Sequence, residues 1–336
     1  MRLSRVSSPW VLAALVVFSL SLAPATAQPR VAFTSTEAVD QAVVQINVIQ
    51  TSNGRTTRGT GSGVVIDSSG LVLTAAHVVT RATRIEVKVL GGDVVPARVV
   101  GIDPVFDAAL VRIDTRVMLP VLPLGSSGAL RREDPVTIFG RSPRRENGPS
   151  TGTFLWVNLE VRPGAPFLLT TAAAYPGDSG GAVVNAAGEL VGIVSGISRD
   201  GKVSFAVAID GIKDIYPDLL VGTVRHPWIG IVGETITDEL AGQLGLLLRR
   251  GVFVVEVVEG SPAAIAGLLG GQSVEPAGLP RGGDIITSVD GRPIRSFGEL
   301  AAYIISKRIG DSVTLQIYRN GRNTTVTIVL GERPDL

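Results

Sequence analysis

Residues 175–182 read YPGDSGGA, so that one serine, Ser179, is enclosed by glycines on both sides. Glycine adopts positive φ angles at little cost and leaves room for a bound molecule beside the backbone. A tight turn of this composition can aim the Gly177 and Ser179 amides at one point, where they stabilise negative charge that develops on an oxygen. The stretch therefore predicts a nucleophilic serine beside an oxyanion-binding pair of amides. The alternative at this point is a plain Gly-Asp-Ser turn between two strands.

A serine nucleophile needs a base within hydrogen-bond reach and a carboxylate that orients this base. The chain has only two histidines, so the choice of base is narrow. His77 follows a β-branched run and adjoins small alanines, which suit a closely packed loop. His226 lies in a linker-like stretch, where we expect a solvated or packing residue. Several aspartates that lie between His77 and Ser179, or adjoin Ser179, could orient the base: Asp93, Asp103, Asp107, Asp114, Asp134 and Asp178.

The composition indicates a globular chain with room for two domains. It has 336 residues, of which 45% are hydrophobic and 18% charged, so a packed core is expected rather than disorder. The net charge is +1 and no basic run stands out, which argues against a nucleic-acid partner. There are no cysteines, so disulfides do not stabilise the fold.

The N-terminus has the pattern of an export signal. Arg2 and Arg5 precede an apolar run over residues 10–22, which is shorter than the ~20 residues of a spanning helix. Residues 25–27 read ATA, a small-residue cleavage site. We therefore expect residues 1–27 to be a signal peptide and the folded part to be periplasmic or otherwise extracytoplasmic. An uncleaved N-terminal membrane anchor is the alternative.

Up to about residue 208 the sequence is a series of short β-branched runs separated by turns, which is typical of an all-β barrel or sandwich. One helix is expected near its end, capped by Asp210 and stopped by Pro217. The expected strands lie at residues 43–49, 63–66, 71–73, 85–90, 97–101, 109–113, 135–139, 154–161, 167–169, 182–184, 190–195 and 203–208.

Beyond a linker over residues 217–228 the pattern changes to a small α+β module. Ser296 is placed to cap a helix over residues 297–306, and a second, shorter helix is expected over residues 261–268. Asn320-Gly321 is a strong two-residue turn signal between two strands. Strands are expected at residues 252–258, 284–289, 313–319 and 324–330.

Three motifs in this order resemble the HtrA (Deg) family of serine proteases. They are TAAHVV at residues 74–79, DAAL at residues 107–110 and PGDSGG at residues 176–181, and the run GTGSG at residues 59–63 is also similar. The resemblance covers nearly all of the chain after the signal segment. It implies a mainly β fold, with a chymotrypsin-like double β-barrel serine protease domain over residues 28–222.

The resemblance also implies roles for individual residues. His77 would be the general base, Asp107 its orienting carboxylate and Ser179 the nucleophile of an acyl-enzyme mechanism. The oxyanion hole would use the amides of Gly177 and Ser179, with a backbone contribution from Asp178. No metal or cofactor is implied. The family implies a homotrimer that degrades misfolded or damaged envelope proteins.

The chain departs from the common family pattern around the expected site. These departures leave its resting activity and its regulation open. They are Asp178 where asparagine is common, Tyr175, Thr171 and the run Arg141-Ser142-Pro143.

Substrate preference can be read in part from the position six residues before the nucleophile. Trypsin-like enzymes that cut after basic residues carry aspartate there, whereas this chain has Ala173. We therefore expect cleavage after small or medium aliphatic residues. The expected pocket is formed by Ala173, Gly192, Ile193, Ser195, Gly196 and Ile197.

The C-terminal module, residues 223–336, resembles a PDZ domain. Residues 228–231 read WIGI and match the loop whose amides receive a peptide carboxylate, so that the peptide adds as a strand beside the sheet. The expected binding residues are Trp228, Ile229, Gly230 and Ile231. Bound hydrophobic C-termini would regulate activity.

Two other functions stay open. One is a membrane-anchored regulatory protease that cuts a specific signalling substrate. The other is a chaperone or peptide-binding scaffold with little proteolysis, against which the three matching motifs argue.

Overall fold

The computed structural model describes residues 36–334, apart from residues 53, 90, 91, 93, 116, 117, 146, 147, 247 and 275–277. The signal segment expected at residues 1–27 and the candidate Asp93 lie outside the described residues. In the described part of the chain, no helix has the length and apolar character needed to cross a membrane.

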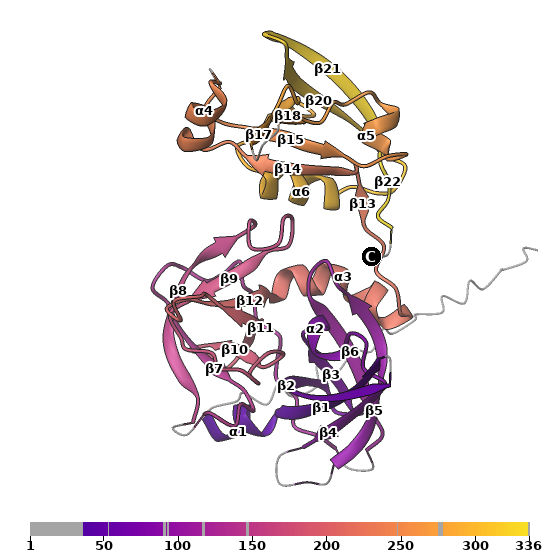
Figure 1. Cartoon of the computed structure of the whole chain (residues 1–336). Helices are drawn as coiled ribbons and strands as arrows, with labels where there is room; N and C mark the ends of the chain where they lie inside the picture. Colours follow the sequence, from indigo (N-terminus) through magenta and orange to yellow (C-terminus); the bar gives the residue numbers. More distant parts are fainter. Residues whose placement is uncertain are drawn as a thin grey trace, which may run out of the picture. The chain divides into compact units, whose positions relative to one another are not determined.

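The first part of the chain forms a closed six-stranded barrel with the strand order β1-β2-β3-β6-β5-β4 (Figure 1). Its interior is filled by alternate residues of the β-branched runs, such as Val44, Ile46 and Val72, each of which is fully buried. This alternation is the period of a strand with one face in a core. The strands are β1 (Val43–Ser52), β2 (Arg55–Asp67), β3 (Leu71–Thr74), β4 (Arg84–Lys88), β5 (Val94–Asp103) and β6 (Ala108–Ile113).

A second closed six-stranded barrel follows, in the order β10-β11-β12-β9-β8-β7. Its interior includes Ile138, Leu168 and Val183, and a further cluster joins Leu110 of the first barrel to Phe167 of the second. The double β-barrel expected from the sequence is confirmed. The strands are β7 (Pro135–Phe139), β8 (Ser150–Asn158), β9 (Phe167–Thr170), β10 (Ala182–Asn185), β11 (Leu190–Ile197) and β12 (Ser204–Ala208).

Three helices accompany the barrels: α1 (Thr36–Gln41), α2 (Ala76–Val79) and α3 (Ile209–Val221). The expected end of α3 at Pro217 is wrong, because the helix runs through this proline and ends at Gly222, whose φ is +109°. The buried side chains of Ile212, Ile215 and Leu219 hold the helix on both sides of the proline. Asp210 does not cap it either.

Asp210 binds elsewhere, because its carboxylate accepts hydrogen bonds from the Ser126 hydroxyl and the Gly128 amide, both at 2.8 Å. The residue at the start of the helix is Ala208, which has no capping side chain, and the Asp210 amide donates to Ser127 Oγ at 3.2 Å.

The C-terminal module is a six-stranded antiparallel sheet with helices, as expected for a PDZ domain (Figure 1). Its main strands follow the order β14-β15-β18-β20-β21, and β19 pairs with β18. Two short strand pairs, β13-β22 and β16-β17, complete it. The strands are β13 (Pro227–Trp228), β14 (Ile231–Thr235), β15 (Val252–Val257), β16 (Gln272–Val274), β17 (Gly278–Arg281), β18 (Ile285–Val289), β19 (Arg292–Pro293), β20 (Ser312–Arg319), β21 (Arg322–Val329) and β22 (Gly331–Glu332).

Local signals in this module are mostly confirmed. Ser296 caps helix α6 (Phe297–Ile305) by accepting a hydrogen bond from Glu299 N. Asn320 and Gly321 have φ angles of +49° and +79°, as a tight hairpin turn requires. Helix α5 is shorter than expected (Pro262–Ile265), and helix α4 (Asp238–Leu244), capped by Thr237, was not predicted.

Candidate active site

The three residues of the expected triad come from three different elements. His77 lies in the short helix α2, Asp107 immediately precedes strand β6, and Ser179 lies in the turn between β9 and β10. Asp107 has a φ of +58°, in the left-handed region, which is uncommon outside glycine. The Asp107 carbonyl accepts a hydrogen bond from Ala76 N, which ties this unusual backbone to the residue before His77.

The His77 imidazole and the Asp107 carboxylate form a close pair. His77 Nδ1 lies 3.0 Å from Asp107 Oδ1 and 2.9 Å from Oδ2, and the His77 backbone amide donates to Oδ1 at 3.0 Å. Asp107 is 1% exposed, whereas the His77 side chain is 42% exposed. A buried carboxylate therefore holds the ring by Nδ1 and leaves the opposite nitrogen, Nε2, available for chemistry.

Ser195 and Arg162 complete the surroundings of Asp107. The Ser195 hydroxyl donates to Asp107 Oδ2, and the Arg162 guanidinium lies 3.9 Å from Oδ1. Burial raises the pKa of Asp107, but the hydrogen bond and the charge of His77, together with the Ser195 hydroxyl, outweigh burial. The net pKa lies below its ordinary value of 3.8, so the carboxylate is ionised at neutral pH.

The turn that carries Ser179 is held at each of its carbonyls. Pro176 O accepts a hydrogen bond from Ser142 Oγ at 2.7 Å. Gly177 O accepts one from Ser62 Oγ at 2.7 Å. The next two carbonyls are bound by amides: Asp178 O by Gly181 N at 2.8 Å and Ser179 O by Ser62 N at 2.7 Å.

These bonds set the direction of the amides, because the C=O and N–H of a trans peptide point opposite ways. With Pro176 O turned to Ser142, the Gly177 amide faces away from that residue. Asp178 O is turned to Gly181, so the Ser179 amide, which belongs to the same peptide unit, faces away from Gly181. The Gly177 backbone, with a φ of +104°, permits this fold of the turn.

The expected backbone contribution of Asp178 is not found. Its amide donates to Tyr175 O at 2.9 Å and is therefore used within the turn. This leaves Gly177 and Ser179 as the pair of amides for an oxyanion. Ser179 itself is half-buried, and within the described contacts its hydroxyl makes no hydrogen bond to the His77 ring. Such bonds often tighten only when substrate binds.

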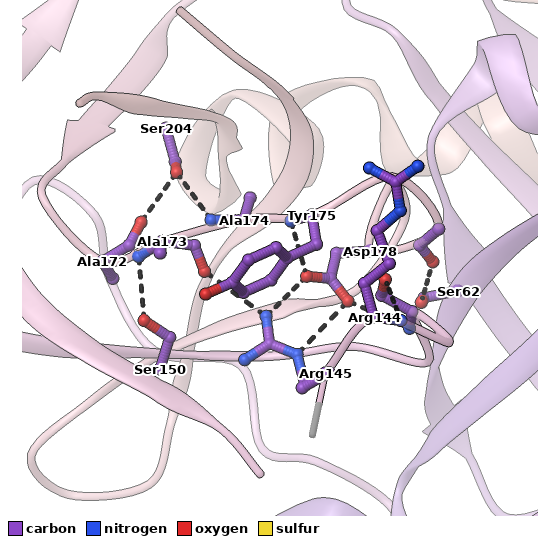
Figure 2. Close-up of polar contacts among 12 residues, drawn as sticks. Ser62, Arg144, Arg145, Ser150, Ala172, Ala173, Ala174, Tyr175, Asp178 and Ser204 are labelled. Atoms are coloured by element: carbon purple, nitrogen blue, oxygen red, sulfur yellow. Dashed lines mark hydrogen bonds and ion pairs between the residues drawn. The ribbon is translucent and has the colours of Figure 1, made fainter. Parts of the chain in front are cut away.

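No role in this turn was predicted for three residues that shape it. Ser62 and Ser142 lie in runs that were singled out in the sequence, whereas Arg145 was not singled out at all. Figure 2 shows Arg145 beside the Asp178 carboxylate, and Ser62 and Arg144 nearby. The sequence pointed to a residue such as Arg145 only through Asp178, because an aspartate that is buried next to the nucleophile requires a cationic or hydrogen-bonding partner. Nothing in the residue spacing says which of the neighbouring arginines provides it.

The expected substrate pocket is brought together only in part. Ala173 and Gly196 are partly exposed and Ile197 is 40% exposed. Ile193 is fully buried in the core and Gly192 is buried as well, so neither can form a pocket wall. The Ile193 side chain belongs to the apolar cluster that also contains Leu110 and Phe167, whereas a Cβ added at Gly192, on the opposite face of β11, would lie 3.8 Å from Leu168 Cδ1. Ser195 is half-buried, and its hydroxyl binds Asp107 instead.

The second histidine, His226, is not solvated. It is 5% exposed, its Nε2 lies 2.9 Å from Asp103 Oδ2, and its ring stacks on Phe106 with centroids 5.5 Å apart. Asp103 is the turn residue expected from its place before Pro104, because its Oδ1 also accepts a hydrogen bond from Val105 N. His226 therefore packs and has no link to Ser179.

The expected carboxylate-binding loop lies between β13 and β14. Ile229 O and Gly230 O accept hydrogen bonds from Ala263 N and Val258 N. The amides of Gly230 and Ile231, which belong to the same two peptide units, consequently face away from Ala263 and Val258. A hollow beside the loop is lined in this module by Trp228, Ile229, Gly230, Ile231, Phe297, Leu300 and Ile304.

Comparison with known proteins agrees with both halves of this description. The trypsin-like peptidase domain family matches residues 61–193, and the PDZ domain family matches residues 227–330. The periplasmic serine endoprotease DegP of Salmonella typhimurium is 34% identical over 279 residues, covering 80% of this chain and 56% of DegP. The putative serine protease HhoA of Synechocystis is also 34% identical, covering 80% of this chain and 70% of HhoA.

One solved structure is covered over a larger share of its own length than DegP or HhoA. The HtrA-type protease AlgW, solved with a decapeptide, superposes with a TM-score of 0.71 at 27% identity, covering 89% of this chain and 98% of AlgW. The chain spans only about half the length of DegP. Because HhoA is 34% identical and is covered over 70% of its length, and both domain families match, the chain belongs to the HtrA family of trypsin-like serine proteases with a PDZ domain.

Proposed function

We propose that the chain is a serine endopeptidase in which Ser179 is the nucleophile, His77 the general base and Asp107 the residue that orients His77. The observation that carries the proposal is the His77–Asp107 pair, with both Asp107 oxygens within 3.0 Å of Nδ1. It leaves Nε2 as the base. In the turn at residues 175–181, the Gly177 and Ser179 amides each point away from the group that binds the carbonyl of the same peptide unit. Serine, base and orienting carboxylate are the minimal set for acyl transfer.

The reaction proceeds through an acyl-enzyme. Ser179 Oγ attacks the substrate carbonyl carbon while its proton passes to His77 Nε2, and the Gly177 and Ser179 amides bind the resulting oxyanion. The scissile C–N bond then breaks, and the protonated His77 gives its proton to the leaving amine. Water then attacks the ester carbonyl carbon while its proton passes to His77. The C–O bond to Ser179 breaks, Ser179 Oγ takes the proton from His77, and the new carboxylic acid leaves.

The substrates proposed are unfolded or damaged proteins outside the cytoplasm. Support comes from relatives named periplasmic serine endoproteases and from the export pattern of residues 1–27. Ala173 occupies the position six residues before Ser179 and is partly exposed. Because it carries no carboxylate to bind a basic side chain, it supports cleavage after small or medium aliphatic residues. The family also supports a homotrimer, which sedimentation of the purified chain tests.

The PDZ domain is proposed to bind hydrophobic peptide C-termini. Support comes from the outward-facing Gly230 and Ile231 amides beside the apolar hollow, and from related HtrA-type structures solved with a decapeptide and a tripeptide. Binding a C-terminus there would shift the protease site between less and more active arrangements.

A second candidate function is regulated cleavage of a specific substrate in response to a peptide. One observation favours it: the similar HtrA-type protease AlgW was solved with a decapeptide and with a tripeptide, which fits control by a bound peptide. Equal degradation of many denatured proteins argues for the first candidate. Cleavage of one sequence, and little of denatured casein, argues for the second.

The proposed chemistry is tested by comparing the parent chain with Ser179→Ala. The parent should degrade denatured casein and react with a fluorophosphonate, whereas S179A should do neither. The labelling is repeated with a C-terminal hydrophobic peptide, which should increase the rate if the PDZ domain controls the site. Equal casein degradation by the two chains would show that the protease proposal is wrong.

A further inference from the structure

The residue before the nucleophile carries a completely buried charge. Asp178 is 0% exposed, and the Arg145 side chain that meets it is 6% exposed. Arg145 Nη2 lies 2.5 Å from Asp178 Oδ2, and Arg145 Nε donates to Oδ1 at 3.3 Å, so the two groups meet through two parallel bonds (Figure 2). Arginine suits this geometry because its planar fork matches a carboxylate.

The same carboxylate also holds two backbone segments. Oδ1 accepts a hydrogen bond from Ser142 N at 3.1 Å, and Oδ2 accepts one from Tyr175 N at 2.9 Å. Asp178 thus connects the loop at residues 141–145 with the first residue of the turn that carries Ser179. Asp178 lies between Gly177 and Ser179 in the chain, so a rotation about its backbone dihedrals changes the orientation of the Ser179 amide relative to the Gly177 amide.

Arg145 is fixed on its other sides as well. Its Nη1 donates to Gly148 O at 3.0 Å, its Nη2 reaches Ala173 O at 3.4 Å, and its guanidinium lies 5.4 Å from the Tyr175 ring centroid. Space around the carboxylate is limited, because a Cβ added at Gly140 would lie 2.2 Å from Asp178 Oδ1. Without Arg145, Asp178 would remain a buried charge that lacks its cation, a costly state that favours movement toward water.

We propose that Arg145 is a positioning residue for the oxyanion-binding amides, acting through its ion pair with Asp178. The pair ties the turn at residues 175–179 to the loop at residues 141–145 and thereby keeps the Gly177 and Ser179 amides convergent. Tyr175, Ser142 and Asp178, three positions at which the chain departs from the common family pattern, are thus connected through the Asp178 carboxylate. This inference rests on the proposed serine-protease function of Ser179.

The main test replaces the guanidinium by a neutral side chain of similar length, Arg145→Met. Because losing one oxyanion donor costs about 10²–10³-fold in kcat, we expect kcat to fall by about 10²-fold, with KM changed by less than about threefold. Affinity for a peptide boronate, which engages the amides, should fall in parallel with kcat. Affinity for a substrate peptide, measured in the Ser179→Ala background with and without R145M, should stay the same.

Two further variants separate electrostatics from packing. In R145M/D178N the buried charge is gone, while the amide oxygen of the replacement side chain can still accept from Ser142 N. The kcat of this double variant should therefore exceed that of R145M by about tenfold, a difference of about 1.4 kcal/mol in activation free energy. Arg145→Lys keeps a charge but loses the paired bonds and should show an intermediate kcat. Arg319→Met serves as a matched control, because Arg319 Nη2 binds the fully buried Asp284 Oδ2 at 2.6 Å within the PDZ domain.

The outcomes are distinguishable. If S179A is inert and R319M keeps the parental kcat while R145M loses it, the inference is supported. An R145M kcat within about threefold of the parent overturns it, as does a double variant no more active than R145M. Equal loss of boronate and substrate-peptide affinity overturns it too, because this indicates general collapse of the site.

If R145M does not fold, the test uses R145K in its place. An R145K kcat equal to that of the parent then overturns the inference. Casein degradation by S179A instead removes the protease proposal itself.

Discussion

The Ser142 hydroxyl donates a hydrogen bond to the Pro176 carbonyl at 2.7 Å and accepts one from Arg144 N at 3.2 Å. Ser142 is 7% exposed, so no bulk water competes for this bond. Its effect reaches the next residue, because the orientation of the Pro176 carbonyl determines the orientation of the Gly177 amide in the same peptide plane. One buried hydroxyl therefore aims one half of the oxyanion-binding pair.

Ser142→Ala should lower kcat with little effect on KM. Without the hydroxyl, the Pro176–Gly177 peptide can turn, and part of the roughly 10²–10³-fold contribution of an oxyanion donor is lost. We expect about a tenfold fall in kcat, measured with a chromogenic peptide ester. Thr83→Val is a suitable control, because Thr83 Oγ1 donates to Ile49 O at 2.9 Å in a similar bond at the surface. Equal kcat for S142A and the parent would contradict this role.

Ser195→Ala should weaken catalysis by affecting the orienting carboxylate. The Ser195 hydroxyl is one of the groups that keep the pKa of Asp107 below its ordinary value. A hydrogen bond to a charged group contributes about 1.5–3 kcal/mol, and if about half of this serves the transition state, kcat falls by roughly 4- to 13-fold. Steady-state kinetics at neutral pH provide the measurement, and Ser195→Thr, which keeps a hydroxyl, should retain more activity than S195A.

Asp107 should also make stability depend on acid pH. Its folded-state pKa lies below 3.8, so its ionised form stabilises the fold fully above that value and loses this contribution as the pH falls through the folded-state pKa. In urea unfolding between about pH 5 and about pH 2, the excess stability of the parent over Asp107→Asn should shrink steadily as the pH is lowered. A difference that grows toward acid would contradict the lowered pKa.

The same D107N variant should be almost inactive at neutral pH. With asparagine in place of the carboxylate, Nδ1 of His77 no longer has an anionic acceptor, and the ring takes the wrong tautomer for a base at Nε2. In proteases of this type, the change lowers kcat by about 10⁴-fold. Residual activity well above that level would mean that another residue orients His77.

The two histidines should behave in opposite ways. His77→Ala should abolish turnover. His226→Ala should keep kcat but lower the free energy of unfolding by about 1–3 kcal/mol, because it leaves one buried oxygen of Asp103 without its hydrogen-bond partner. Chemical denaturation and peptide cleavage, measured on the same preparations, separate the effects. Loss of kcat in a folded H226A protein would give that residue a role beyond packing.

Much of the fold follows from local pattern. Alternating buried valines and isoleucines predicted most barrel strands, and Ser296 and Asn320 predicted a helix cap and a hairpin turn, because these signals act over a few residues. The end of α3 was mispredicted at Pro217, since core contacts of Leu219 beyond it outweigh the local preference of proline. Burial of Ile193 likewise depends on its packing in the cluster that contains Leu110 of the first barrel, which no local pattern reveals.

The sequence by itself determined the chemistry that is available: one serine among glycines, one suitably placed histidine and the DAAL motif that singles out Asp107. Only the tertiary structure decided how that chemistry is held in place. Ser62, Ser142 and Arg145 lie 117, 37 and 34 residues before Ser179, yet they bind or brace the turn that carries it. The reason is physical: a hydrogen bond or ion pair depends on distance in space, and closure of the two barrels brings together groups that are far apart in the chain.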